Sequence, residues 1–188
     1  MKKITLILSM LSIACIYAQS AHEPSKEFPF GQPNPEAPKE VKDFHPMIGM
    51  SDCTSELRNP DGSWQHIKKM QWEFKYIMDG KGVQDQTWIE DGRQAGSIRQ
   101  YIADSSRWYV HFYSSNFPST TLPAWEGNKI GDEIILYRDQ KAPNGMDGSY
   151  KITFFEMNDE GYKWKGEWVN KDESIIYPTW KINCTKRR

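Results

Sequence analysis

The sequence has little net charge and none of the common catalytic motifs. Lys and Arg together number 24 and Asp and Glu number 25, a formal net charge of −1. Without a basic excess there is little to attract a phosphate backbone, so we expect no nucleic-acid partner. The sequence also contains no G-x-S-x-G, P-loop, H-E-x-x-H or dinucleotide-binding fingerprint. Any catalytic function therefore has to be argued from side chains that the fold brings together.

Long apolar runs are absent except at the N-terminus. Lys2 and Lys3 precede the apolar segment 4–18, and Ala18-Gln19-Ser20 follows. The run of 15 residues is short for a bilayer span, and a basic start with small residues at the end is typical of a secretory signal peptide. We predict a signal peptide over 1–20, cut after Ala18 or Ser20, with an uncleaved anchor as the alternative. The mature chain would have no membrane span and would be periplasmic or secreted.

Cysteine is scarce, with 3 in the chain. Cys15 lies in the predicted signal peptide, which leaves Cys53 and Cys184. An exported pair of cysteines indicates a disulfide, although two buried free thiols are the alternative. The sequence has no C-x-x-C motif and no clustered Cys and His spacing, so we expect neither a redox centre nor a metal site.

The length of 188 residues suits a single folded domain. Residues 21–43 are rich in proline and poor in apolar side chains, which predicts a linker or a surface wrap. Phe28 and Phe30 would attach it, and a proline-rich partner motif is the alternative. A short helical turn is expected around 41–44. The folded domain is then expected over 44–188.

Aromatic residues are abundant, with 8 Trp, 9 Tyr and 8 Phe. From residue 44 onward, Asp-Gly and Asn-Gly pairs recur between runs rich in β-branched and aromatic residues, which is typical of hairpin-linked strands. We predict an all-β, antiparallel up-and-down β-barrel of about 8–10 strands. The expected strands are 50–58, 64–78, 83–90, 94–103, 107–114, 124–130, 133–139, 149–158, 162–170 and 175–184.

Two strands show which side chains would face the interior. In 64–78 the alternate positions include Trp72, Phe74 and Tyr76, and in 162–170 they include Trp164 and Trp168. Alternation of this kind buries one face of a strand and exposes the other. A barrel of this size holds one small ligand, so these aromatic residues are the predicted lining of a binding site for a hydrophobic or amphipathic molecule.

The start of the predicted barrel carries a family resemblance. Phe44-x4-Gly49 opens the first strand, a hairpin with Asn59-Pro60-Asp61-Gly62 at its turn follows, and the segment Trp72-Glu73-Phe74-Lys75-Tyr76-Ile77-Met78-Asp79-Gly80 comes next. This resembles the calycin superfamily, in particular secreted bacterial calycin-like domains of unknown function, and the resemblance covers 44–184. It implies a lipocalin-like barrel with a cavity, and no particular activity. The usual Gly-x-Trp opening has Ser51 in place of Trp, so another side chain would have to close the barrel floor.

Histidine is the first candidate for acid–base chemistry. His66 shares the inward parity of Trp72, and His111 lies in an alternating aromatic strand. Either side chain would serve as a general base or an axial heme ligand, and a hydrogen-bonded sheet histidine is the alternative. We expect no heme and no other cofactor, because nothing around these residues favours a porphyrin.

Asp85 and Arg99 form a second candidate set. An inward Arg99 would bind a carboxylate or phosphate, and an inward Asp85 would pair with it or act as a base. In the alternative, Ile98 and Ile102 face inward and Arg99 faces solvent.

Two loops, 114–123 and 140–148, exceed the usual hairpin length of about two to five residues and are expected at the barrel mouth or at simple sheet corners. Three functions remain open at this point: ligand binding, catalysis by the inward polar groups, and a ligand-free interaction module with a filled core.

Overall fold

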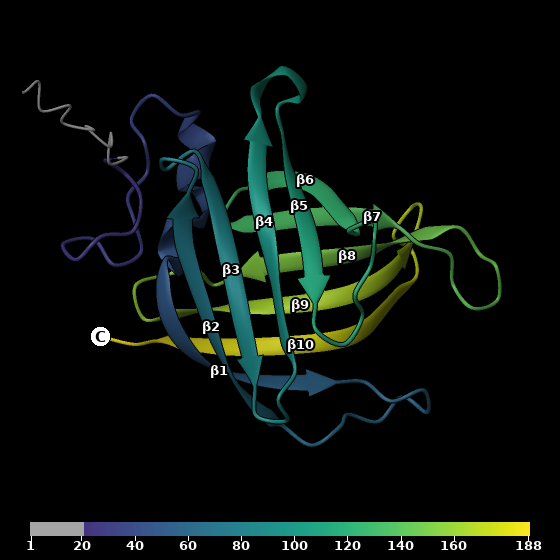
Figure 1. Cartoon of the computed structure of the whole chain (residues 1–188). Coiled ribbons are helices and arrows are strands. Elements are labelled where there is room, and N and C mark those ends of the chain that lie inside the picture. The colour runs from purple at the N-terminus through teal and green to yellow at the C-terminus, as the bar shows by residue number, and fades with distance from the viewer. Residues whose placement is uncertain (1–20) are drawn as a thin grey trace, which may run out of the picture.

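Ten antiparallel strands of residues 21–188 follow one another and close into a barrel (Figure 1). The computed structural model describes residues 21–188, so the predicted signal peptide lies outside the described residues. The strands are β1 (Gly49–Leu57), β2 (Lys68–Ile77), β3 (Gly82–Ile89), β4 (Gln94–Ile102), β5 (Arg107–Ser114), β6 (Ala124–Ile130), β7 (Glu133–Asp139), β8 (Gly148–Phe155), β9 (Gly161–Asn170) and β10 (Ile176–Lys186). The prediction of an all-β up-and-down barrel is confirmed.

The expected strand 64–78 is too long at its start. β2 begins at Lys68, which pairs with Ser55 of β1, and Trp64 makes an isolated bridge to Arg58. The turn that follows β1 brings Gln65 back to pair with its end, with the Gln65 N–H donating to the Leu57 carbonyl over 2.8 Å, but the Arg58–Trp64 bridge differs in register by one residue from the Ser55–Lys68 pair. Alternation therefore begins only where the ladder of hydrogen bonds begins.

The barrel closes between β1 and β10, which are antiparallel neighbours. Cys53 and Cys184 lie directly opposite each other in this register, and a disulfide joins them across 131 residues of sequence. The predicted disulfide is therefore present. Both cysteines belong to the buried core, so the bridge faces the barrel interior.

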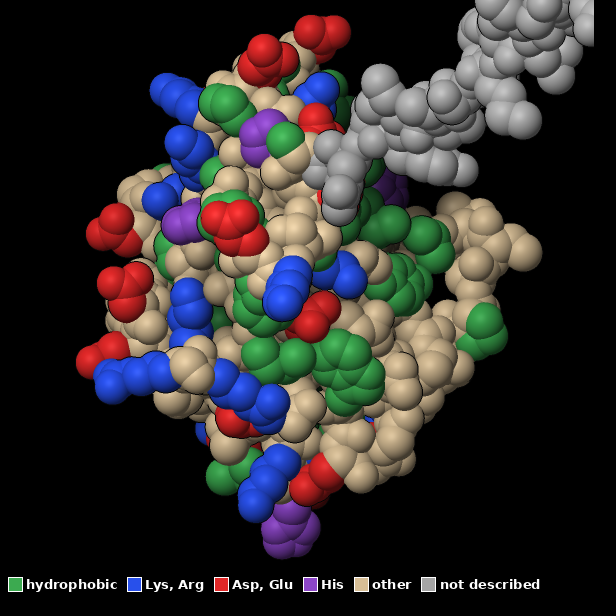
Figure 2. Space-filling view, turned by 60° about the vertical axis from the view of Figure 1, so that its left-hand side comes forward, with side chains coloured by type: hydrophobic (Ala, Val, Ile, Leu, Met, Phe, Trp, Pro, Cys, Tyr) green, Lys and Arg blue, Asp and Glu red, His purple; other side chains and the backbone are tan. Residues whose placement is uncertain are grey.

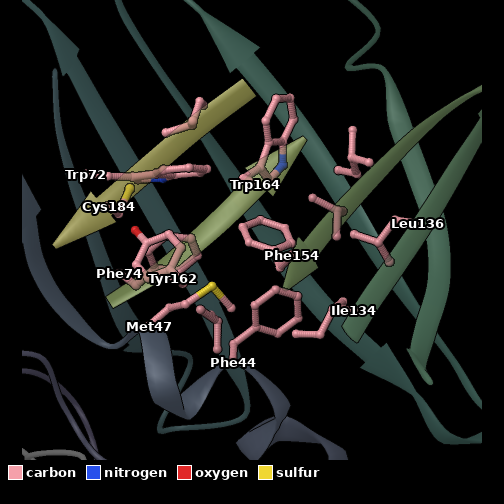
Figure 3. Packing of buried hydrophobic residues seen from close by; sticks show 14 of the residues in the cluster. Phe44, Met47, Trp72, Phe74, Ile134, Leu136, Phe154, Tyr162, Trp164 and Cys184 are labelled. Atoms are coloured by element: carbon pink, nitrogen blue, oxygen red, sulfur yellow. The ribbon is translucent and has the colours of Figure 1, made fainter. Parts of the chain in front are cut away.

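One end of the barrel is closed by a 3-10 helix, η1 (Lys39–Met47). Val41, Phe44 and Met47 are spaced three residues apart, so a helix with three residues per turn aligns them on one face, and all three are buried. Phe44 meets the Trp108 ring edge-on, with ring centroids 4.8 Å apart. Figure 3 shows Phe44 and Met47 rising from the helix into the barrel. The plug that the Gly-x-Trp motif would supply thus comes from the residues before β1.

The helix is longer than the predicted turn at 41–44, and Val41 belongs to the core although the sequence placed it in the linker. A hydrogen bond also fixes the helix to β5, because the Trp108 indole N–H donates to the Asp43 carboxylate over 3.1 Å. Burial raises the pKa of Asp43 above its ordinary value, and the hydrogen bond from Trp108 opposes that rise.

The segment before the helix lies against the turn between β2 and β3. The Tyr76 N–H donates to the Phe30 carbonyl over 2.9 Å, and the Asn34 N–H donates to the Gly80 carbonyl over 3.1 Å. Gly80 has a φ of 71°, and a Cβ there would lie 2.3 Å from the Gln32 carbonyl oxygen, so only glycine fits this approach. Basic and acidic side chains are interspersed over this side of the molecule (Figure 2). No helix within the described residues is long and apolar enough to cross a membrane.

Candidate ligand-binding cavity

A cavity of about 340 Å³ lies inside the barrel, beyond the core that η1 plugs. Strand ends far from the helix supply its rim, including Ile89 at the end of β3 and Trp125 at the start of β6. Its wall is mostly apolar and aromatic, formed by Met70, Trp72, Ile89, Val110, Phe112, Trp125, Tyr150, Ile152, Phe154, Trp164, Trp180 and Ile182. The interior is therefore divided into a filled end and a hollow end.

Three of the six residues predicted to bind a ligand line this cavity: Trp72, Arg99 and Trp164. Phe74 and Tyr76 face inward as predicted but lie fully buried in the filled end, and neither lines the cavity. Their assignment to the ligand site is corrected for a physical reason: the side chains of η1 occupy the space in front of them. The Tyr76 hydroxyl lies 3.0 Å from His45 Nδ1, and burial raises the pKa of the phenol.

Trp168 is buried near the cavity but is not part of its wall. Its indole N–H donates to the Gln140 carbonyl oxygen over 2.8 Å. Since Gln140 does line the cavity, Trp168 positions a wall residue rather than contacting the interior space itself.

Asp85 and Arg99 both point inward and form a buried ion pair. Their side chains are only 3% and 2% exposed. Asp85 also accepts a hydrogen bond of 2.7 Å from the Trp72 indole N–H. Arg99 lies over the Phe74 and Phe44 rings, 4.8 and 5.0 Å from their centroids, which adds cation–π attraction. The pair marks the boundary between the filled core and the cavity, and Asp85 compensates the charge of Arg99.

Neither of the two candidate histidines, His66 and His111, faces the cavity. His66 lies outside β2 and is exposed, because the β1–β2 loop includes it. His111 lies on β5 between Val110 and Phe112, which line the cavity, so its side chain is on the outer face. None of the histidines among residues 21–188 lines the cavity. Within residues 21–188, no group of three or more His, Cys, Asp or Glu side chains is arranged to hold a metal ion.

Arg138 is a cavity residue that sequence reasoning missed. Arg138 follows Ile134 and Leu136 at alternate positions of β7, and these positions face inward. The alternation along this strand could therefore have predicted that Arg138 faces the interior. The guanidinium lies over the Trp125 ring, 4.4 Å from its centroid, and donates to Gln140 Oε1 over 2.7 Å. Burial lowers the pKa of Arg138, although an arginine stays charged at neutral pH.

The two long loops meet this end of the barrel, which favours the mouth over simple sheet corners. Pro123 from the first loop and Gln140 from the second line the cavity. A second hollow on the outside shares Phe112 and Pro123 with the first, and its wall includes the loop residue Phe117. Phe117 is 79% exposed. The 114–123 loop thus lies between the cavity and solvent.

Solved structures resemble this barrel. The Mycobacterium tuberculosis protein Rv2717c matches with a TM-score of 0.54 at 10% identity, over 81% of this chain and 100% of that chain. At this identity the match shows a shared fold and no more. A redesigned β-barrel matches at 11% identity with a TM-score of 0.32, over 78% of this chain and 96% of that one. A Nostoc punctiforme protein of unknown function from the DUF3598 family matches at 5% identity with a TM-score of 0.26, over 80% of this chain and 100% of that one. No protein-family model matches the chain. No curated protein matches it in sequence.

Proposed function

We propose that this protein is an exported barrel that binds one small hydrophobic or amphipathic molecule in its interior. The observation that carries the proposal is the cavity of about 340 Å³ with its aromatic wall. Ligand sites in proteins are typically concave, mostly apolar and roughly 300–1,000 Å³ in volume, with a few polar groups that orient the ligand. This cavity lies at the small end of that range, so the ligand is a compact one.

Two features support export to the periplasm or beyond. The basic and apolar N-terminus has the pattern of a signal peptide, and the Cys53–Cys184 disulfide suits an oxidising compartment. Membership of the calycin superfamily is part of the same proposal. It is supported by the closed barrel and the resemblance at the start of β1.

The alternatives have less support. Catalysis was expected to use His66 or Asp85 together with Arg99, but Asp85 and Arg99 are bound to each other and His66 lies in the exposed β1–β2 loop. A ligand-free interaction module was expected to have a filled core, and the barrel is hollow at one end. Binding is therefore the function that the geometry supports best.

The decisive experiment for the proposal is native mass spectrometry of the protein purified from its own host. A retained small molecule that dissociates on unfolding would support binding directly. A protein of bare polypeptide mass that also binds no hydrophobic or amphipathic probe in titration would contradict it.

Trp164→Ala is expected to abolish ligand binding while the protein stays folded. The Trp164 ring packs edge-on against Trp180, with centroids 5.1 Å apart, and it lines the cavity. Because one side of the ring faces open space, the free energy of unfolding should fall by less than the roughly 3–5 kcal/mol expected for Phe74→Ala in the packed core. Trp88→Ala, on the outer face of β3, is the matched control and should bind normally. Unchanged affinity in folded Trp164→Ala would contradict the site.

Heme is expected to be absent from the purified protein. An axial histidine would have to reach the cavity, and His111 points away from it. An absorption spectrum should show no Soret band. A Soret band that disappears in His66→Ala or His111→Ala would overturn this expectation.

A further inference from the structure

The two arginines that line the cavity differ in how their charge is compensated. Arg99 is paired with Asp85. Within residues 21–188, the ion pairs of arginine are formed by Arg93, Arg99, Arg107 and Arg187, so Arg138 has no acidic partner there. Its guanidinium donates a hydrogen bond to the neutral side-chain amide oxygen of Gln140. The hollow end of the barrel therefore carries one uncompensated positive charge.

Arg138 is half-buried, so part of its charge is withdrawn from water. Removing a cation from water is unfavourable unless an anion or several hydrogen bonds replace the lost solvation. Tyr150 lies opposite Arg138 on β8, and only its ionised form would stabilise the charge of Arg138. Burial raises the pKa of Tyr150, so at neutral pH this phenol is uncharged and contributes no counter-ion.

A second donor beside Arg138 also lacks a partner. The indole Nε1 of Trp125 is buried and makes no hydrogen bond, although the ring forms part of the cavity wall. The Arg138 guanidinium lies over this same ring, so both groups belong to one patch of the wall. A buried indole N–H usually has an acceptor. This patch of the wall therefore combines the Arg138 charge, which has no acidic partner, with a buried indole N–H that has no acceptor.

The position of the patch fixes how a ligand would lie. Arg138 and Gln140 are at the end of β7 and in the loop that follows, near the mouth. The deeper wall includes Trp72 and Phe154, which Figure 3 shows among the packed core rings. An amphiphile with its polar group at the mouth would place its apolar part against these rings.

We propose that the ligand is an amphiphile with a compact anionic head group, a carboxylate or a group of similar size, bound by Arg138 beside the Trp125 ring. This inference rests on the proposed function, because it assigns a chemical class to the molecule in the same cavity. A guanidinium forms paired hydrogen bonds to a carboxylate, and Gln140 holds it in place for that contact. Asp85 keeps Arg99 from competing for the anion.

The test compares three probes that share one apolar chain: decanoate, decanol and decylammonium. Binding is measured by calorimetry and by the fluorescence of the tryptophans in the wall. The wild-type protein should bind decanoate about tenfold or more tightly than decanol, and decylammonium least of all. Arg138→Gln should lose this preference and bind decanoate and decanol alike. Arg107→Gln, an arginine on the outside of β5, is the matched control and should keep the preference.

The outcomes separate this inference from the proposed function. Equal binding of decanoate and decanol by the wild type would reject the anionic class and leave the binding function intact. Failure of all three probes would count against both. A preference for decanoate that persists in folded Arg138→Gln would reject the role of Arg138. If that variant does not fold, the wild-type preference among the probes and its weakening by added salt still decide the question, because only a charge-dependent contact is screened.

Discussion

Asp85→Ala is expected to lower the free energy of unfolding by about 3–5 kcal/mol, because it leaves the Arg99 charge buried without a partner. Arg99 is only 2% exposed, so its charge depends on the carboxylate of Asp85 more than on water. The same substitution removes the acceptor of the Trp72 indole N–H. Urea unfolding followed by far-ultraviolet circular dichroism gives the change directly.

Two further variants isolate the cause of that loss. Glu126→Ala removes an acidic partner from an exposed arginine, Arg107, and should cost about 0.2–1 kcal/mol. Asp85→Leu combined with Arg99→Met removes both buried charges and should recover much of the stability lost in Asp85→Ala. If Asp85→Ala lost no more stability than Glu126→Ala, Asp85 would not be the partner that compensates the buried charge of Arg99.

Removing the disulfide is expected to cost about 2–4 kcal/mol of stability, because the reduced chain gains the conformational freedom of a loop that the bridge had closed. The loop is long, with 131 residues separating Cys53 from Cys184. The measurement is urea unfolding of Cys53→Ala combined with Cys184→Ala, with the oxidised wild type as reference.

The single variant Cys184→Ala separates the link from the packing of the sulfur atoms. It breaks the bridge but keeps one buried sulfur, so it should be nearly as unstable as the double variant if the link dominates. A thiol count on unfolded, unreduced wild type should find no free thiol in the mature chain. Two free thiols, or a double variant within about 0.5 kcal/mol of the wild type, which is the range of ordinary surface substitutions, would contradict the stabilising role.

The order of the strands was predictable because turn chemistry is local. Pairs such as Asp79-Gly80 and Asp91-Gly92 suit the backbone of tight turns, and strands joined by such turns pair with their neighbours. The disulfide followed from the same logic, since closing an up-and-down barrel places its first and last strands together.

Side-chain direction was harder to predict where both faces of a strand are apolar. His111 stands in an aromatic run, and β7 has isoleucine on both faces before Arg138. Hydrophobicity alone does not decide which face of such a strand points inward; the register with neighbouring strands does.

The filling of one end of the barrel by the 3-10 helix was not predicted, for another reason. A short 3-10 helix has no extended periodic pattern, so Phe44 and Met47 gave little sign that they would occupy the space before Phe74.

The closure between β1 and β10 has a consequence for the order in which the molecule assembles. Within residues 21–188, every other pair of neighbouring strands is consecutive along the chain, so those contacts can form locally, hairpin by hairpin. Until β10 has paired with β1, both of these strands present unpaired backbone edges, which are the surfaces prone to aggregation. Cys53 and Cys184 meet in register only when this last pairing is complete. Their oxidation therefore marks the molecules in which assembly has finished, and it covalently fixes the one contact that local folding does not supply.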